Sequence, residues 1–376
     1  MQKDLWSITS FLENKNYKFN KENILTQLPE KFIEEAIKAI SSWDNYAPTP
    51  LVKLNKLNDE LKFKNIYYKD EDKRFDLKSF KALGGAFAVY KIASEKENIT
   101  VSTATAGNHG RSVAWGAQRL GLKCKIFISE FVSESRAEAM RKLDAEVIRV
   151  KGNYDNSLKE CIKQSKENNW EIVQDVSWEG YKEVPKLIMA GYTIMIKEIL
   201  DEVKSNSISH VFLQAGVGGM AAAMIAGFAK LSQNIPKFII VEPENADCVF
   251  QSIKNNKPTS VDIKKETVMG GMSCGDVSSI AWEILKNSSN YCLTISDEAI
   301  STTVALLAEK RLSDEKIIAG ECAVPGIIAL ISSFNNKEYL DKLELNEQSN
   351  VLLFGCEGLT DSAMYQKLLS DGLQKI

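Results

Sequence analysis

Apolar runs rich in β-branched residues alternate along the chain with amphipathic or alanine-rich segments. Such runs predict buried strands, and the segments between them predict helices that cover both faces of a parallel sheet. The predicted strands are NIYYKDE, ITVSTAT, KCKIFIS, EVIRV, EIVQD, HVFLQ, KFIIVEP and NVLLFG. The predicted helices cover residues 31–43, 80–94, 108–120, 134–142, 154–166, 181–203, 219–231 and 298–309. We therefore expect an α/β fold.

One nearly uncharged stretch, residues 211–231, approaches the length of about 20 residues that a membrane helix needs. Gly216, Gly218 and Gly219 divide it into a short β-rich run and an alanine-rich segment. This division favours a strand, a loop and a helix in a buried core. Because glycine also occurs in membrane-spanning helices, such a helix stays an alternative.

Length and composition are those of a globular protein of about two domains. The chain has 376 residues, of which 44% are hydrophobic and 26% charged. These values exclude disordered and fibrous classes, but composition marks no domain boundary. The formal net charge of -3 provides no basic surface for nucleic acid or for a membrane. The expected partner is a small molecule or another protein chain.

Cysteine and histidine usage narrows the chemistry further. The seven cysteines are an odd number without a Cys-x-x-Cys pair, so neither a disulfide framework nor a zinc cage is expected. The two histidines, His109 and His210, lie far apart in the sequence, which argues against a histidine-based metal site or a Ser-His relay. The first residues lack the apolar core of a signal peptide. We expect a cytoplasmic protein without a metal.

Three predicted strand-to-helix junctions have unusual residues: Ser79-Phe80-Lys81, residues 105–110 (TAGNHG) and residues 216–220 (GVGGM). In open α/β sheets ligands bind at the carboxyl ends of the strands. These junctions are therefore the candidate site.

The glycine-rich junction follows a strand and opens a helix, an arrangement whose N–H groups suit a phosphate. Gly216-x-Gly218-x-x-Ala221 also satisfies a relaxed dinucleotide fingerprint, with Glu242 as the candidate ribose acceptor. A tight turn needed only for helix–strand packing is the third interpretation.

Lys81 has a position unusual for lysine, because it follows Leu77 and Phe80 in a segment that otherwise resembles a core. A solvated surface lysine is the default, but desolvation would lower the pKa of the amine and make it a nucleophile that can form a Schiff base. A lysine of this kind together with a phosphate loop points to pyridoxal phosphate as cofactor.

Six motifs resemble the fold type II, or tryptophan synthase β-like, pyridoxal-phosphate enzymes, and within them the diaminopropionate ammonia-lyases. The motifs are residues 74–87 (RFDLKSFKALGGAF), 106–115 (AGNHGRSVAW), 174–181 (QDVSWEGY), 269–275 (MGGMSCG), 320–326 (GECAVPG) and 356–361 (CEGLTD). The resemblance implies two open, twisted, mainly parallel sheets with flanking helices. It further implies a discontinuous large domain (1–84 plus 191–376), a smaller domain (85–190), a cofactor in the cleft between them, and a homodimer.

The resemblance also implies a role for each residue. Lys81 would anchor the cofactor and remove the α-proton, and Asp175 would bind the β-amino group. Asn108 would bind the cofactor's phenolic oxygen, and Cys356 would face its pyridine nitrogen, with the adjacent Glu357 as a complication if it turned inward. The phosphate would bind Gly216, Val217, Gly218, Gly219 and Met220, and the substrate would bind Ser79, Thr105, Ala106, Gly107 and His109.

Structural interpretations stay open for four of these residues. Asn108 could also be a helix N-cap, and Asp175 could be a turn or N-cap residue. His109 could be purely structural. Cys356 could be a buried inert thiol.

Ala106 departs from the family, whose loop has Asp immediately before Gly-Asn-His as the base that acts on the D-isomer. The resemblance then implies a preference for the L-isomer, and the Ala-Gly-Asn-His segment is also similar to threonine and serine dehydratases. The expected reaction is β-elimination of ammonia from 2,3-diaminopropionate, giving pyruvate and ammonia. The alternatives are L-serine or L-threonine dehydration, β-replacement, an NAD(P)-dependent oxidoreductase, or a binding protein without turnover.

Overall fold

The computed structural model describes residues 5–105, 107–203 and 208–376, and the chain divides into two compact units. The first unit consists of Met1–Pro29, Pro48–Lys73 and Met195–Ile376, and the second of Glu30–Ala47 and Arg74–Ile194. The smaller domain predicted from the sequence, residues 85–190, lies inside the second unit. That unit also includes residues 30–47, 74–84 and 191–194.

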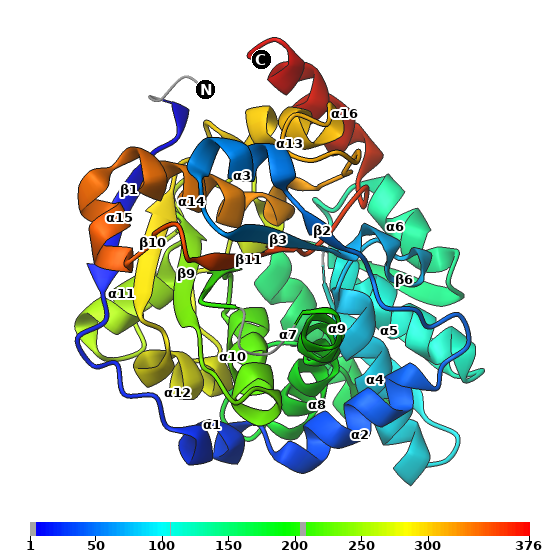
Figure 1. The fold of residues 1–376 in the computed structure, drawn as a ribbon. Coiled ribbons are helices and arrows are strands. Elements are labelled where there is room, and N and C mark those ends of the chain that lie inside the picture. Colours follow the sequence, from blue (N-terminus) through cyan, green and yellow to red (C-terminus); the bar gives the residue numbers. More distant parts are fainter. Residues whose placement is uncertain (1–4, 106, 204–207) are drawn as a thin grey trace. The chain divides into compact units, whose positions relative to one another are not determined.

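Within the described residues, the first unit has a seven-stranded sheet in the order β1-β10-β9-β8-β11-β3-β2. The five central strands are parallel, and β1 and β2 are antiparallel to their neighbours at the two edges. In Figure 1, β1, β10 and β9 lie side by side toward one edge, and β11, β3 and β2 toward the other. The strands are β1 (Ile8–Glu13), β2 (Leu51–Lys53), β3 (Asn65–Asp70), β8 (His210–Gln214), β9 (Lys237–Pro243), β10 (Tyr291–Ile295) and β11 (Asn350–Gly355).

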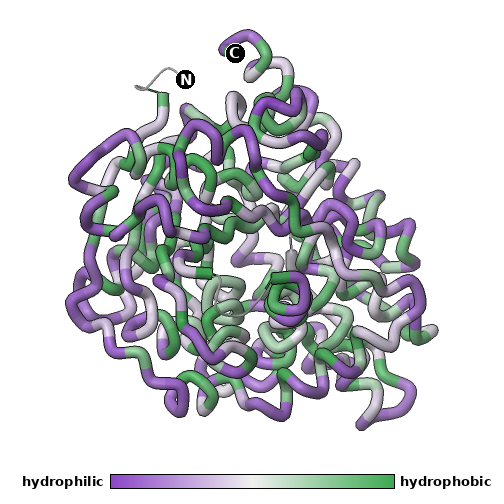
Figure 2. The backbone as a smooth tube through the Cα atoms, viewed as in Figure 1, coloured by the Kyte–Doolittle hydropathy of each residue, from purple (hydrophilic) through white to green (hydrophobic). Residues whose placement is uncertain are grey.

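Apolar helices cover this sheet. All of β8 and β11 is buried, as is most of α10 and α14, because continuous apolar runs suit strands that are covered on both faces. Figure 2 shows that hydrophilic residues predominate in outer segments such as α15. The helices of this unit are α1 (Lys21–Gln27), α3 (Asn55–Leu61), α10 (Gly219–Leu231), α11 (Cys248–Asn255), α12 (Ser279–Ser288), α13 (Ile300–Ala308), α14 (Pro325–Asn335), α15 (Lys337–Leu343) and α16 (Ser362–Leu373). Helix α9 (Ile194–Glu202) belongs to it except for its first residue.

The second unit has a parallel sheet in the order β6-β5-β4-β7. Its strands are β4 (Thr100–Ala104), β5 (Lys123–Ser129), β6 (Ala145–Val150) and β7 (Glu171–Ile172). Its helices are α2 (Glu30–Ser41), α4 (Lys81–Glu95), α5 (Asn108–Arg119), α6 (Glu134–Arg141), α7 (Tyr154–Asn168) and α8 (Glu183–Tyr192). Helix α4 packs against both α5 and α8. Gly84 makes the contact with α8 possible, because a Cβ there would lie 2.5 Å from a ring carbon of Tyr192.

The predicted α/β architecture with two mainly parallel sheets is confirmed. The stretch at 211–231 consists of strand β8, the glycine loop and α10, and no helix of the described residues is long and apolar enough to cross a membrane. The single helix predicted over residues 181–203 is wrong. The chain forms α8 and α9 there, separated at Thr193, whose hydroxyl donates to the carbonyl of Ala190 at 2.6 Å and competes with continued helical bonding.

Candidate active site

Lys81 is the first residue of α4, at the end of a loop with an unusual backbone. Phe75, Asp76 and Lys78 have positive φ angles of 48°, 59° and 59°, a conformation that costs energy outside glycine and often marks functional sites. The buried Ser79 hydroxyl accepts the N–H of Lys81 at 3.3 Å. The hydroxyl predicted to bind substrate therefore stabilises the start of the lysine's own helix.

The side chain of Lys81 is ion-paired with Asp175, which lies 94 residues further along the chain. The lysine Nζ donates to Oδ2 of Asp175, and the two side chains are 26% and 15% exposed. Burial alone would raise the pKa of Asp175. At the acidic pH where Asp175 titrates, the charge of His109, which is protonated there, the charge of Lys81 and the hydrogen bond from Lys81 outweigh burial, so that the pKa of Asp175 lies below its ordinary value. The structure thus brings the two predicted catalytic residues together.

Asp175 is positioned by the segment that follows β7. The Val173 N–H donates to the Ser102 carbonyl at 2.8 Å, which extends the sheet by one residue. The Gln174 side chain donates to the Ala104 carbonyl at 2.9 Å and accepts from the Ala104 N–H at 3.1 Å. Gln174, the residue before Asp175, therefore hydrogen-bonds to the last residue of β4. The Gly-Asn-His loop begins just after that residue.

A turn with two aromatic residues follows Asp175 in the chain and also helps to position it. The rings of Trp178 and Tyr181 stack with centroids 4.2 Å apart, across a turn in which Gly180 has a φ of +81°. The Tyr181 hydroxyl accepts the Gln174 N–H at 2.9 Å and donates to the Ile172 carbonyl at 2.8 Å. The QDVSWEGY motif is thus a compact turn that fixes the carboxylate.

His109 is buried next to Asp175, the carboxylate of the Lys81–Asp175 pair. It is 4% exposed, and its Nε2 lies 2.8 Å from the Val173 carbonyl oxygen. Its Nδ1 lies 3.8 Å from Oδ2 of Asp175. Burial lowers the pKa of His109, although the charge of Asp175 opposes this effect, and the ring is neutral at neutral pH. Its Nδ1 faces the Asp175 carboxylate, and contact with substrate stays a prediction.

The Gly-Asn-His segment forms the start of α5. Thr105 is 9% exposed, and its hydroxyl accepts the Gly107 N–H at 3.3 Å. Gly107 is the N-cap of α5, so Asn108 is the first helical residue and the N-cap interpretation of Asn108 is wrong. A Cβ at Gly107 would meet nothing within 4 Å, which leaves room for a ligand there. The predicted substrate-binding residue Ala106 lies outside the described residues.

Tyr192 is a site residue that the sequence did not indicate. Its side chain is 2% exposed, and its ring packs against that of Phe80 at an interplanar angle of 58°, with centroids 4.7 Å apart. Burial raises its pKa, and the charge of Lys81 lowers it in part. Tyr192 lies within an apolar helix, 111 positions after Lys81 in the chain, so local pattern offered no signal; only the packing of α8 on α4 brings it there.

The predicted phosphate loop lies in the first unit, between β8 and α10. Gly218 is the N-cap of α10 with a φ of +88°. A Cβ at Gly216 would lie 3.0 Å from Sγ of Cys274, whereas at Gly219 it would meet nothing within 4 Å. Val217 accepts the Ser278 N–H at 2.9 Å, which anchors the loop to α12. The first N–H groups of α10, including that of Met220, lack intrahelical acceptors as at any helix start and can bind an anion.

Cys356 directly follows β11 and is 4% exposed. Its thiol donates to the Cys322 carbonyl at 3.1 Å. Glu357 is also buried, and its Oε1 accepts the Cys322 N–H at 3.2 Å, while its own carbonyl accepts the N–H of Gly320. The Sγ atom of Cys322 and one carboxylate oxygen each from Glu321 and Glu357 all lie within 4.8 Å of one another. The Glu357 carboxylate thus interacts with the loop at 320–322.

Glu242 does not have the role that a dinucleotide site would give it. It is fully buried, and its two carboxylate oxygens accept the N–H groups of Val249 and Phe250 at 2.9 and 2.7 Å. A carboxylate engaged at the start of α11 is not available to a ribose hydroxyl. This contradicts the oxidoreductase alternative.

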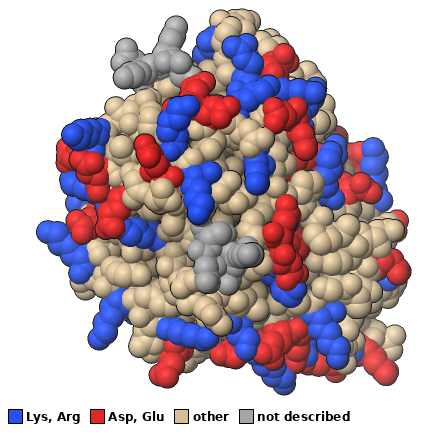
Figure 3. Space-filling model, in the orientation of Figure 1, with Lys and Arg blue, Asp and Glu red and all other residues tan. Residues whose placement is uncertain are grey.

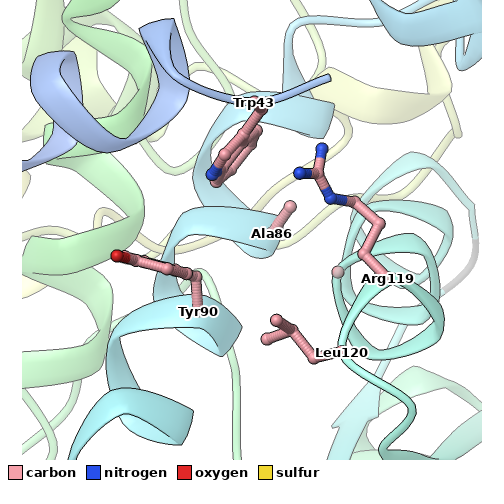
Figure 4. A pocket seen from close by; sticks show the side chains of 6 residues that line it. Trp43, Ala86, Tyr90, Arg119 and Leu120 are labelled. Carbon is pink, nitrogen blue, oxygen red and sulfur yellow. The ribbon is translucent and has the colours of Figure 1, made fainter. Parts of the chain in front are cut away.

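A shallow cavity of about 100 Å³ on the second unit contains none of the predicted site residues. Its lining consists of Trp43, Ala86, Tyr90, Gly116, Arg119 and Leu120. Figure 4 shows the Arg119 side chain extending beside Trp43, and the Cζ atom of its guanidinium lies 4.6 Å from the centroid of that ring. On the visible face of the molecule acidic and basic side chains are interspersed (Figure 3), as the small net charge implies.

Comparison with known proteins identifies the family. The model of the family described as pyridoxal-phosphate dependent enzyme matches residues 43–357. The diaminopropionate ammonia-lyase of Escherichia coli strain K12 is 34% identical to this chain over 352 residues, which cover 87% of this chain and 88% of that protein. The chain belongs to the diaminopropionate ammonia-lyase family.

Solved structures of this family agree with the fold. The Escherichia coli diaminopropionate ammonia lyase in complex with D-serine matches with a TM-score of 0.90 and 31% identity, covering 98% of each chain. The same enzyme in complex with an aminoacrylate-PLP azomethine reaction intermediate matches with a TM-score of 0.88 and the same identity, again over 98% of each chain.

The residues described above fit the cofactor of the diaminopropionate ammonia-lyase family. Gly216 lies so close to Cys274 and to the Gly271 carbonyl that only a residue without a Cβ fits unstrained, and Gly219 leaves open space at the helix start. The Lys81 amine is held beside a carboxylate in the second unit. These features match a phosphate cradle and a reactive amine.

Proposed function

We propose that the chain catalyses the β-elimination of ammonia from 2,3-diaminopropionate, giving pyruvate and ammonia. The Lys81–Asp175 ion pair carries this proposal. It combines an amine that can act as a base with a carboxylate that can bind a second substrate amine. Membership of the ammonia-lyase family supports the same substrate.

Residues of both units would hold pyridoxal phosphate, in a site that we propose to be the cleft between the two domains. Lys81 and Asn108 belong to the second unit, and the loop at 216–220 and Cys356 belong to the first. When bound, the cofactor supplies an electrophilic carbonyl and a ring that stabilises negative charge at the substrate Cα. A neutral Cys356 thiol facing the pyridine nitrogen would limit that stabilisation and favour prompt loss of the β-substituent.

The remaining steps are proton transfers by this chain's residues. Lys81 removes the α-proton, and Asp175 orients the β-amine and delivers the proton with which it leaves as ammonia. The N–H groups at the start of α5, together with Ser79, Thr105, Ala106 and His109, would hold the substrate carboxylate. Water then converts the released aminoacrylate to pyruvate and a second ammonia.

We further propose a preference for the L-isomer, because Ala106 cannot accept a proton where the family has an acidic residue. Ala106→Asp is expected to raise kcat/KM for D-2,3-diaminopropionate by about 10²-fold or more, the usual contribution of one general base. Pyruvate release from each isomer measures this. Efficient D-isomer turnover by the unchanged enzyme would contradict it.

A substrate panel tests the proposed function against its alternatives. Pyruvate release is measured with L- and D-2,3-diaminopropionate and with L-serine, and 2-oxobutyrate release with L-threonine. The proposal predicts the highest kcat/KM for L-2,3-diaminopropionate. A higher value for L-serine or L-threonine would indicate a dehydratase, and a coloured protein without turnover of any substrate would indicate a binding protein.

A cytoplasmic location and a homodimer complete the proposal. The seven cysteines are free thiols, which supports a reducing compartment. The dimer rests on the family resemblance, and light scattering of the purified protein measures it directly.

A further inference from the structure

The Nδ1 atom of His109 faces the Asp175 carboxylate without a hydrogen bond. Among the described residues no group donates to or accepts from this nitrogen, which lies 3.8 Å from Asp175 Oδ2. The ring is 4% exposed. A buried polar atom without a partner costs free energy, so this one calls for an explanation.

The hydrogen bond at Nε2 determines which ring nitrogen of neutral His109 carries the proton. The Val173 carbonyl can only accept, and Nε2 lies 2.8 Å from its oxygen. Nε2 therefore carries the hydrogen, and neutral His109 presents a lone pair on Nδ1. The ionisable groups that act on the ring are Asp175 and Lys81, and burial keeps its pKa below the ordinary value.

Two acceptors thus face each other, and the space between them lacks a proton. In the structure Lys81 holds Oδ2 of Asp175 through a hydrogen bond. Once the lysine amine is engaged elsewhere, Asp175 loses this cation, and burial then favours its protonated form. A movement of about 1 Å would bring a protonated carboxyl within hydrogen-bond distance of Nδ1.

We propose that His109 is the positioning residue that holds a proton on Asp175, by accepting a hydrogen bond from the protonated carboxyl at Nδ1. This inference rests on the proposed function. The proton comes from the substrate ammonium group, whose N–H bond breaks as an O–H bond forms on Asp175. When the Cβ–N bond breaks, its electron pair goes to the nitrogen and the Asp175 proton joins it. Ammonia then leaves without an external acid.

The leaving group provides the test. The β-amine must receive a proton to leave as ammonia, whereas the chloride of β-chloro-L-alanine leaves without a proton. His109→Gln retains an amide that can donate to Val173 but has no proton acceptor at the Nδ1 position. In the holoenzyme this variant is expected to lower kcat for L-2,3-diaminopropionate by at least about ten-fold and to change kcat for β-chloro-L-alanine by less than about two-fold. An equal loss with both substrates would overturn the proposal, because misfolding or poor cofactor binding affects both.

His210 offers a matched control. It is also buried, with Nε2 2.9 Å from the Leu343 carbonyl oxygen, but its Nδ1 has the Ser209 hydroxyl as partner at 2.8 Å. His210→Gln is expected to leave the ratio of the two kcat values unchanged. The ratio compares kcat for L-2,3-diaminopropionate with kcat for β-chloro-L-alanine. If it falls as far in His210→Gln as in His109→Gln, the assignment to His109 is overturned.

A measurement on the unchanged holoenzyme keeps the proposal testable if His109→Gln does not fold. The chain has only two histidines, so ¹⁵N-histidine NMR resolves both rings, and His210→Gln assigns them. We expect His109 Nδ1 to be unprotonated at neutral pH, and a proton on it would overturn the proposal. If the unchanged enzyme eliminates from L-serine but not from 2,3-diaminopropionate, the proposed function fails. His109 is then tested with L-serine, whose hydroxyl also needs a proton to leave.

Discussion

At the scale of single residues, the ion pair between Lys81 and Asp175 is the centre of the proposed site. The two residues belong to different sequence motifs, residues 74–87 and 174–181. Their contact depends on the packing of α4 beside the segment after β7. The same holds for Tyr192, which reaches the lysine only through the close approach of two helices at Gly84.

Asp175→Asn tests the carboxylate directly. The amide keeps the shape of the side chain but can neither hold the leaving proton nor pair with an ammonium group. We expect kcat for L-2,3-diaminopropionate to fall by about 10²-fold or more, with a much smaller change for β-chloro-L-alanine. Steady-state pyruvate release measures both, and the cofactor absorbance band confirms loading. An unchanged kcat for the diamine would contradict the assigned role.

At the scale of elements, the glycine loop and the aromatic turn are built from residues that a sequence can reveal. Glycines between a buried strand and a helix indicated the loop, and Gly218 has the left-handed backbone that such a loop requires. The role of Gly216 was less visible. Cys274, which lies 58 positions further along the chain, would have to shift to admit a Cβ there.

Gly218→Ala tests the loop as an element. The φ of +88° strains any L side chain, and the added Cβ would lie 2.8 Å from Leu285 Cδ1. We expect the free energy of unfolding to fall by about 1–3 kcal/mol, together with weaker pyridoxal phosphate binding. Thermal unfolding and absorbance titration with the cofactor measure the two effects.

Gly270→Ala is the matched control, because a Cβ at Gly270 would meet nothing within 4 Å. It is expected to bind the cofactor as the unchanged chain does. Equal cofactor affinity for Gly218→Ala and the unchanged chain would show that the backbone at Gly218 is not needed for the phosphate.

At the scale of the whole molecule, alternation of apolar runs and helices was enough to predict the fold class. The antiparallel edge strands were missed for physical reasons. β1 is only partly buried, so it lacks a continuous apolar run, and β2 has three residues. The buried strand β10 was also missed, and its five residues follow a polar segment. The limits of the two units depend on long-range packing, which no local pattern reports.

One buried carboxyl, that of Asp70, contributes a pH dependence to the stability of the first unit. Burial raises the pKa of Asp70 to about 6 from 3.8, and the charges of Asp72 and Glu71 add to this against the hydrogen bond from the Asp72 N–H. At this group the folded chain binds more protons than the unfolded chain between about pH 4 and 6. The contribution of Asp70 to stability therefore falls as pH rises through that window.

Asp70→Asn is expected to remove this penalty. The amide oxygen can still accept the Asp72 N–H, which lies 3.1 Å from Oδ1 in the structure. The free energy of unfolding should rise by up to about 3 kcal/mol above pH 7, and the gain should disappear as pH approaches 4. Urea unfolding across pH 4–8 measures it, and a variant less stable than the unchanged chain at pH 7.5 would contradict the assignment.

The most direct test of the central claim is the ratio of ammonia to pyruvate released from L-2,3-diaminopropionate. Elimination of the β-amine followed by hydrolysis predicts two ammonia molecules for each pyruvate, and loss of both products in Lys81→Ala. One ammonia per pyruvate, no pyruvate at all, or full activity of Lys81→Ala would contradict the account.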